Sequence, residues 1–178
     1  EIVEPMVSKQ WFLKTAEMSE VALKAVQEEE MTFFPKGWEN TYFSWLKNPK
    51  DWCISRQLWW GHQIPVFNCR KCQHQWAAEE TPSQCVQCQS DDFYQDPDVL
   101  DTWFSSGLWP LSTLGWPNEK AMKEKGFEKF YPNTTLVTGF DIIFFWVARM
   151  MMMSLKVTGK SPFKHTYIHA IVRDKNGR

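Results

Sequence analysis

The stretch TTLVTGFDIIFFWVARMMMMS, residues 134–154, decides the fold class. Its first five residues are rich in β-branched side chains, which are typical of a strand, and Gly139 separates them from a long apolar run of helical character. This helix is apolar nearly all round, so we expect it to be buried. KHTYIHAIVRD (164–174) predicts a second strand from about Tyr167, followed by a turn at KNG. Strand, buried helix and strand form a βαβ unit, which predicts an α/β fold with a parallel sheet.

Further helices are expected on either side of this unit. AEMSEVALKAVQEEE, from Ala16, has apolar residues at helical spacing, with Thr15 as its N-cap. A break at residues 34–37 precedes a second helix, WENTYFSWLKN, which a following proline should end near Lys47. NEKAMKEKGF predicts a short, solvated helix capped by Asn118.

Tryptophans recur every seven residues, at Trp38, Trp45, Trp52 and Trp59. A packed aromatic stripe that spans two elements is the simpler interpretation of this spacing. A surface on which a ligand or RNA stacks is the alternative.

The composition restricts the class of protein. With 43% hydrophobic and 23% charged residues, the 178-residue chain is expected to be globular and soluble. Its net charge of −1 provides no general basic field for nucleic acid. The longest apolar run, residues 142–148, is too short to span a bilayer, and no signal peptide is visible. Four of the five cysteines lie in pairs, which favours metal binding in a reducing compartment, so a cytoplasmic location is expected.

The paired cysteines, Cys69, Cys72, Cys85 and Cys88, have the spacing of a zinc ribbon. Two Cys-x-x-Cys knuckles complete a tetrahedral shell of four sulfurs, which suits Zn²⁺; disulfides or a site that has lost its metal are the alternatives. Such a shell is closed to substrates and contributes folding energy, on the order of 10 kcal/mol in apparent binding. Cys53 stands alone and is expected to be a small buried residue.

Chemistry is instead expected where the first strand meets its helix, at Thr138, Gly139 and Asp141. Ligands of open parallel sheets bind beyond the carboxyl ends of the strands. Gly139 permits close backbone approach, and the Asp141 carboxylate suits a ribose hydroxyl or an amino group. The alternative is that Asp141 only complements the helix dipole. His169 is expected in mid-strand, where a satisfied core histidine is more common than a catalyst.

Four blocks of the sequence resemble class I aminoacyl-tRNA synthetases, and most closely their valyl branch. They are DWCISRQLWWGHQIPVF (51–67), DPDVLDTWFSSGLWPLSTLGWP (96–117), LVTGFDIIFFWVARMMMM (136–153) and YIHAIVRDKNGR (167–178). GFDIIFFW indicates the valyl branch, because the isoleucyl and leucyl relatives usually carry a different GxD sequence. The resemblance covers nearly the whole chain and implies the second half of a Rossmann-like catalytic domain with parallel strands and a small zinc-ribbon insertion.

The resemblance also implies roles for individual residues. The implied sites are Trp103, Ile142 and Trp146 for the valine pocket; Thr138, Gly139, Asp141, His169, Ala170 and Val172 for the adenylate and ribose; and Arg56 and Trp60 as a possible border of the active site. The family usually has His-Gly where this chain has His169-Ala170, which makes close backbone approach to adenine less secure. No catalytic residue is implied within the chain.

Four segments are expected from this resemblance. Residues 1–50 are a helical junction after an editing domain, 51–68 return to the catalytic domain, 69–95 are the zinc ribbon, and 96–178 are the carboxyl-terminal half of the catalytic domain. The chain lacks an initiator methionine and ends at RDKNGR, so we expect a fragment. The HIGH histidines and the KMSKS lysine loop would lie outside it, and the isolated chain is therefore predicted to be inactive.

The implied parent is a monomeric ATP-dependent valine–tRNA ligase with no membrane partner. It would join valine to AMP from magnesium-bound ATP, transfer it to tRNA(Val), and contain a structural zinc ion. A fragment of an isoleucyl- or leucyl-tRNA synthetase is one alternative. A stand-alone zinc-ribbon module that binds RNA or protein is another, although Arg70 and Lys71 are the few basic residues near the knuckles and acids flank them.

Overall fold

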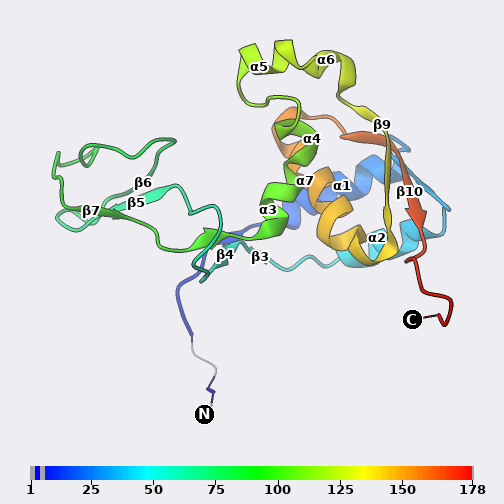
Figure 1. Ribbon diagram of the computed structural model, residues 1–178, viewed down its shortest axis with the longest axis horizontal. Coiled ribbons are helices and arrows are strands. Elements are labelled where there is room, and N and C mark those ends of the chain that lie inside the picture. The colour runs from blue at the N-terminus through cyan, green and yellow to red at the C-terminus, as the bar shows by residue number, and fades with distance from the viewer. Residues whose placement is uncertain (1–2, 5–6, 178) are drawn as a thin grey trace. The chain divides into compact units, whose positions relative to one another are not determined.

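The computed structural model describes residues 3–4 and 7–177, and the chain divides into two compact units (Figure 1). Unit 1 comprises residues 1–12 and 53–102, and unit 2 comprises residues 13–52 and 103–178. The amino-terminal helices therefore fold together with the carboxyl-terminal βαβ unit. The functional names that the sequence suggests for its four segments stay predictions.

Unit 2 is built on a parallel sheet of three strands in the order β2-β10-β9. The strands are β2 (Thr32–Phe34), β9 (Asn133–Gly139) and β10 (Phe163–His169). The parallel pairing of β9 with β10 confirms the predicted βαβ unit. Two expectations were wrong: β10 begins at Phe163, not near Tyr167, and His169 is its exposed last residue, not a core position. The sequence also missed β2, because three residues are too few to show a pattern.

The two faces of this sheet differ in burial. Phe33, Leu136, Thr166 and Ile168 are buried, whereas the row Phe34, Tyr167 and Val137 on the other face is exposed. Burial alternates along each strand because successive side chains of a strand point to opposite faces of the sheet.

Helices α1 (Ala16–Gln27) and α7 (Arg149–Thr158) pack on each other. The four consecutive methionines from Met150 are all buried, and the Ser19 hydroxyl lies 3.3 Å from the Met152 sulfur. Thr15 takes the predicted N-cap position of α1, but its side chain does not cap the helix. Its hydroxyl instead donates to the Lys50 carbonyl oxygen at 2.9 Å.

The helix predicted after Gly139 changes its winding twice. It begins as a 3₁₀ turn, η1 (Phe140–Ile142), continues as a π-helix, η2 (Ile143–Ala148), and becomes α-helical only in α7. The expected burial holds from Val147 onward but is wrong for Phe140 and Phe145, which are 37% and 43% exposed. Segments of π-helix are often found at functional sites.

Shorter helices complete unit 2. They are α2 (Trp38–Leu46), α3 (Thr102–Gly107), α4 (Trp109–Ser112), α5 (Glu119–Glu124) and α6 (Phe127–Phe130). Helix α2 ends before Lys47 as predicted. The Asn118 side chain accepts a hydrogen bond from the Ala121 amide at 2.9 Å, which confirms the predicted cap of α5.

Unit 1 is made of short antiparallel ladders. Strands β5 (Val66–Cys69), β6 (Gln75–Ala77) and β7 (Phe93–Gln95) form a sheet in the order β6-β5-β7. A further antiparallel pair is β4 (Ser55–Arg56) with β8 (Val99–Leu100). The short strands β1 (Phe12–Leu13) and β3 (Trp52–Cys53), whose residues are divided between the two units, form a separate two-stranded sheet. Across the described residues, no helix has both the length and the apolar character that a membrane crossing would require.

Candidate functional site

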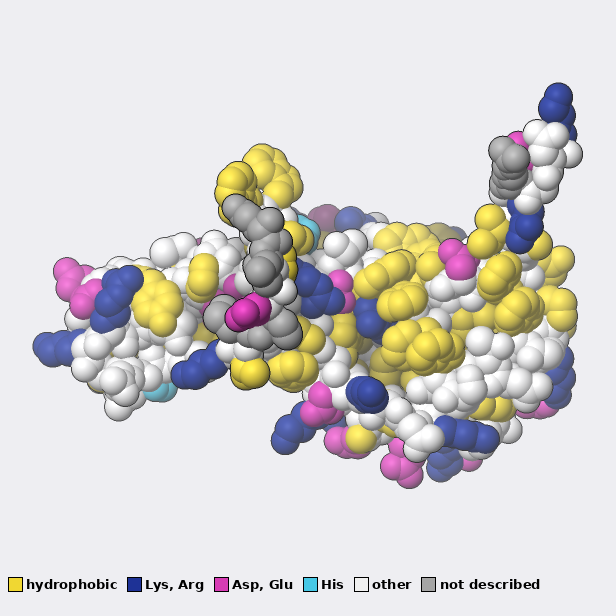
Figure 2. All heavy atoms as spheres, turned by 90° about the horizontal axis from the view of Figure 1, so that it is seen from below, with side chains coloured by type: hydrophobic (Ala, Val, Ile, Leu, Met, Phe, Trp, Pro, Cys, Tyr) yellow, Lys and Arg dark blue, Asp and Glu magenta, His cyan; other side chains and the backbone are white. Residues whose placement is uncertain are grey.

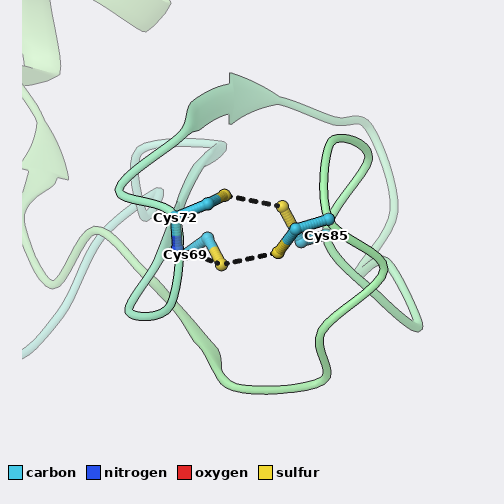
Figure 3. Close-up of side chains that lie close together, drawn as sticks. Cys69, Cys72 and Cys85 are labelled. Carbon is cyan, nitrogen blue, oxygen red and sulfur yellow. Dashed lines mark hydrogen bonds between the residues drawn. The ribbon is translucent and has the colours of Figure 1, made fainter.

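The four paired cysteines converge in unit 1 (Figure 3). Cys69 ends β5, Cys72 follows in the first turn, and Cys85 and Cys88 come from the second turn. Each turn folds back on its first cysteine: the Gln73 amide donates to the Cys69 carbonyl oxygen, and the Gln89 amide donates to that of Cys85. Gln73 and Gln89 both have a positive φ, near 59° and 58°. The two knuckles therefore repeat one local conformation.

The sulfur positions fit a tetrahedral metal ion. The Sγ atoms all lie within 4.8 Å of one another, and the pairs Cys69–Cys88 and Cys72–Cys85 are each 3.6 Å apart. Four sulfurs about 2.3 Å from one zinc ion would be about 3.8 Å apart. A disulfide requires about 2.05 Å, and all five cysteines are free thiols. The geometry is therefore compatible with a bound Zn²⁺ ion, and the sulfur atoms are too far apart for disulfide bonds.

The thiols also perturb one another electrostatically. Burial raises the pKa of Cys85, but the backbone amides of Cys88 and Gln87 and the neighbouring thiols outweigh this effect and lower it to about 7. At Cys72 an amide of His74 acts to lower the pKa, yet burial and the three other thiols raise it to about 12. Four sulfurs this close cannot all become thiolates unless a cation compensates their charge.

A second candidate site lies at the carboxyl end of the parallel sheet in unit 2. Gly139 ends β9 directly beside His169, which ends β10. A Cβ atom built on Gly139 would lie 2.5 Å from Asp141 Oδ1 and 3.8 Å from His169 Cε1. Gly139, Asp141 and His169, three of the predicted adenylate residues, thus lie close together where the backbone of Gly139 carries no side chain. Thr138, which precedes them, is buried.

The valine-pocket residues predicted from the sequence lie on α3, η1 and η2. Trp103 stacks on Phe145, with ring centroids 5.6 Å apart. The Trp146 indole donates to the Ser106 carbonyl oxygen at 3.1 Å, which ties η2 to α3. Ile142 ends η1 and is half-buried. The structure therefore holds these side chains on neighbouring elements, and their roles stay predictions.

Further aromatic pairs connect η1 and η2 to α2. Trp38 stacks on Phe140 at a centroid distance of 5.4 Å, and Trp45 stacks on Phe144 at 4.7 Å. Figure 2 shows hydrophobic side chains gathered over this part of unit 2. Trp38, Trp45 and the buried Trp52, which contacts Phe104, thus each pack on a ring from another segment, as a packed stripe requires, although Trp45 remains 52% exposed. The predicted stripe is wrong for Trp59, which is fully exposed in unit 1.

The remaining predicted site residues are less constrained. Arg56, in unit 1, forms an ion pair with the buried Asp101 at 3.0 Å and donates to two backbone carbonyl oxygens. Trp60, in the same unit, is 92% exposed. Ala170 and Val172 follow the end of β10 and are exposed, although the Ala170 carbonyl oxygen lies 2.8 Å from His169 Nδ1. Arg56 is thus held by an ion pair, whereas the Trp60 side chain is exposed to solvent.

Sequence reasoning missed the partners that hold these residues. The sequence predicts Phe140, Phe144 and Phe145 only as parts of a buried helix, whereas each stacks on a tryptophan from another segment. The regular spacing of Trp38 and Trp45 was the available signal. It did not indicate which rings they would meet.

The sequence matches the family described as tRNA synthetases class I (I, L, M and V) over residues 1–178. The valine–tRNA ligase of Wolinella succinogenes is 56% identical over 182 residues, which cover 99% of this chain. That of Clostridium acetobutylicum is 53% identical over 177 residues, again 99% of the chain. The chain spans about a fifth of the length of these curated relatives, 20% in both cases.

Two solved structures share the fold. The methionyl-tRNA synthetase of Mycobacterium tuberculosis, bound by methionyl-adenylate, matches 93% of this chain and 27% of its own, with a TM-score of 0.61 and 18% identity. The LeuRS agnB2 of Agrobacterium radiobacter K84, in a ternary complex with tRNA and LeuAMS, matches 72% of this chain and 20% of its own. Its TM-score is 0.59, with 20% identity.

Proposed function

The chain belongs to the family of class I tRNA synthetases, and we propose that it forms part of the catalytic domain of a valine–tRNA ligase. The similarity to valine–tRNA ligases at 56% identity carries this proposal. The complete enzyme would join valine to the AMP part of ATP, with release of pyrophosphate, and transfer the valyl group to tRNA(Val). The two relatives described above, which match 99% of the chain, are valine–tRNA ligases, and this favours valine over an isoleucyl or leucyl specificity.

In the activation step, the valine carboxylate attacks the α-phosphate of ATP, an acyl-phosphate bond forms, and pyrophosphate leaves. Gly139 and the exposed end of β10 would accept the adenylate, because the missing Cβ leaves the backbone open to a ligand. Asp141, on the first turn after β9, would hold the amino group of valine or a ribose hydroxyl. These groups bind and orient; the chain supplies no group that we assign to bond making.

An apolar pocket explains the choice of amino acid. Trp103, Ile142 and Trp146 would surround the valine side chain, and the stacked Phe145 supports the first of them. Such a wall excludes larger side chains by shape but discriminates poorly against a hydroxyl. In valyl enzymes, which are the standard example of this limit, an apolar pocket rejects threonine only about 10²-fold.

The thiol site would serve the fold and not the reaction. Cys69, Cys72, Cys85 and Cys88 supply four ligands, which leaves no position open for substrate. A bound zinc ion would join the two knuckles and stabilise unit 1. The expectation that the complete enzyme is monomeric stays a prediction.

Amino-acid-dependent ATP–pyrophosphate exchange tests the proposal. The matching fifth of the Wolinella succinogenes enzyme would be replaced by this chain, and the chimera compared with valine, isoleucine, leucine and threonine. We expect strong exchange with valine and about 10²-fold weaker exchange with threonine. A preference for isoleucine or leucine would contradict the specificity. The isolated chain is expected to give no exchange, and activity from it would contradict the assignment of bond-making groups to other parts of the enzyme.

A further inference from the structure

A buried cation lies behind the aromatic surface of unit 2. Arg149, the first residue of α7, is only 6% exposed. Its guanidinium carbon lies 3.8 Å from the ring centroid of Trp52 and 5.5 Å from those of Phe144 and Phe145. All three distances fall within the range of about 6 Å over which a cation is attracted to a ring face.

The rings around Arg149 connect it to the surface. Phe144 stacks on Trp45, and Phe145 stacks on Trp103. Phe144 and Phe145 also contact each other edge to face, at 5.4 Å. Each of these two phenylalanines therefore has a tryptophan partner and the same guanidinium within cation–π range. The cation therefore contacts Phe144 and Phe145 directly and is connected through them to Trp45 and Trp103.

The contact with Phe145 has a physical consequence for Trp103. The Arg149 guanidinium lies over the Phe145 ring across the η2–α7 junction. A cation–π contact is attractive only where the cation lies over the face of the ring, so it favours one ring orientation. An aliphatic side chain in the same space would pack against the ring without selecting its tilt. Phe145 is 43% exposed, so packing alone surrounds only part of it.

We propose that Arg149 is a positioning residue for amino-acid specificity: its buried guanidinium fixes Phe145, and through it the stacked Trp103, so that the pocket rejects side chains larger than valine. This inference rests on the proposed function, because it takes Trp103 as a wall of the valine pocket. Arg149 does not touch the substrate in this account. It acts through a ring that touches another ring.

The test uses the chimera described above and three variants. Arg149→Met removes the cation but keeps an unbranched apolar side chain, and Arg149→Lys keeps the charge but loses the planar group. Lys156→Met is the matched control, because it removes a cation from the exposed side of the same helix, where Lys156 pairs only with the exposed Glu17 at 3.4 Å among the described residues.

We expect Arg149→Met to narrow the ratio of kcat/KM for valine over isoleucine by about tenfold, since one methylene is worth about 10–200-fold in such a pocket. Arg149→Lys should fall between Arg149→Met and the unsubstituted chimera, and Lys156→Met should leave the ratio unchanged. An unchanged ratio in an active Arg149→Met chimera would overturn the inference and leave the proposed function intact. Loss of valine preference in the unsubstituted chimera would instead contradict the proposed function.

A second measurement keeps the inference testable without activity. The full chain would be labelled with 5-fluorotryptophan at its eleven tryptophans, and the Trp103 resonance assigned from a Trp103→Phe variant. We expect Arg149→Met to shift or broaden this resonance, because the guanidinium no longer holds Phe145, the stacking partner of Trp103, in one orientation, while Lys156→Met leaves it in place. A Trp103 signal that stays unchanged in Arg149→Met, as it does in Lys156→Met, would overturn the positioning role.

Discussion

The thiol site of unit 1 and the site at the carboxyl end of the parallel sheet in unit 2, called the sheet edge below, are built in opposite ways. The thiol site takes its four ligands from twenty residues of chain, in two turns that repeat one conformation. The sheet edge takes its side chains from three distant segments, around residues 38–45, 103 and 138–169. The first is closed and would depend on a metal ion; the second is open and depends on packing. The two roles that we propose, stabilisation for the thiol site and substrate binding for the carboxyl end of the sheet, thus correspond to whether the groups leave room for a ligand.

Removal of zinc is the largest predicted effect and should separate the two regions. Chelation, or Cys85→Ser, would remove a ligand set whose apparent binding is worth on the order of 10 kcal/mol in structural sites. We expect residues 66–95 to lose protection from hydrogen exchange while β9 and β10 keep theirs. Zinc content and exchange mass spectrometry would be measured together, with Cys53→Ser as the control. Equal loss of protection in both units would break the comparison.

Gly139→Ala should affect the open site with little effect on folding. The added methyl group would lie 2.5 Å from Asp141 Oδ1, whereas the backbone φ of Gly139, −73°, suits alanine. The carboxylate must therefore move, and a displacement of about 1 Å at a substrate-positioning group can cost about 10²-fold in rate. Kinetics of valine activation by the chimera would measure this loss.

The matched control for that variant is Gly37→Ala, because a Cβ atom there meets nothing within 4 Å. Similar thermal unfolding of both variants, with a rate loss only at Gly139, would support a binding role for this edge. Full activity of the Gly139→Ala chimera would remove Gly139 and Asp141 from the proposed site.

Tyr42→Phe tests whether packing between segments supports the open site. Tyr42 is fully buried on α2, and its hydroxyl donates to the Ala22 carbonyl oxygen of α1 at 3.1 Å. Burial also raises the pKa of Tyr42, so the phenol stays protonated and remains a donor. We expect the free energy of unfolding of unit 2 to fall by about 1–3 kcal/mol, because the carbonyl group loses its buried partner. Denaturant unfolding followed by tryptophan fluorescence would show it, and an unchanged midpoint would argue against this contact.

Asn118→Ala is the smallest predicted effect and should leave both sites intact. The Asn118 side chain caps α5, a short helix with no buried residue among those described. Loss of such a cap costs about 0.5–2 kcal/mol, and here the loss would be confined to local fraying of α5. Hydrogen exchange at Ala121 should accelerate, while valine activation by the chimera stays the same. A change in activation would show that α5 contributes to the site.

The same contrast explains what the sequence could predict. The thiol site was predictable residue by residue, because Cys-x-x-Cys spacing encodes a local turn. The parallel βαβ unit and the place of Gly139 and Asp141 were also predictable, because strand, glycine and apolar helix follow one another in the chain. The short strand β2 and the winding of η2 were not, since tertiary packing decides both. Nor could the sequence pair Trp38 with Phe140 or place Arg149 among rings, because those contacts join segments about 100 residues apart.

Hydrogen exchange of the chimera with a non-hydrolysable valyl-adenylate analogue tests the central claim most directly. We predict new protection at residues 138–146 and 167–172, where the strands β9 and β10 end, and no change at residues 69–88. Protection centred on the thiol site, or absent from the ends of both strands, would contradict the assignment of substrate binding to the open edge of unit 2.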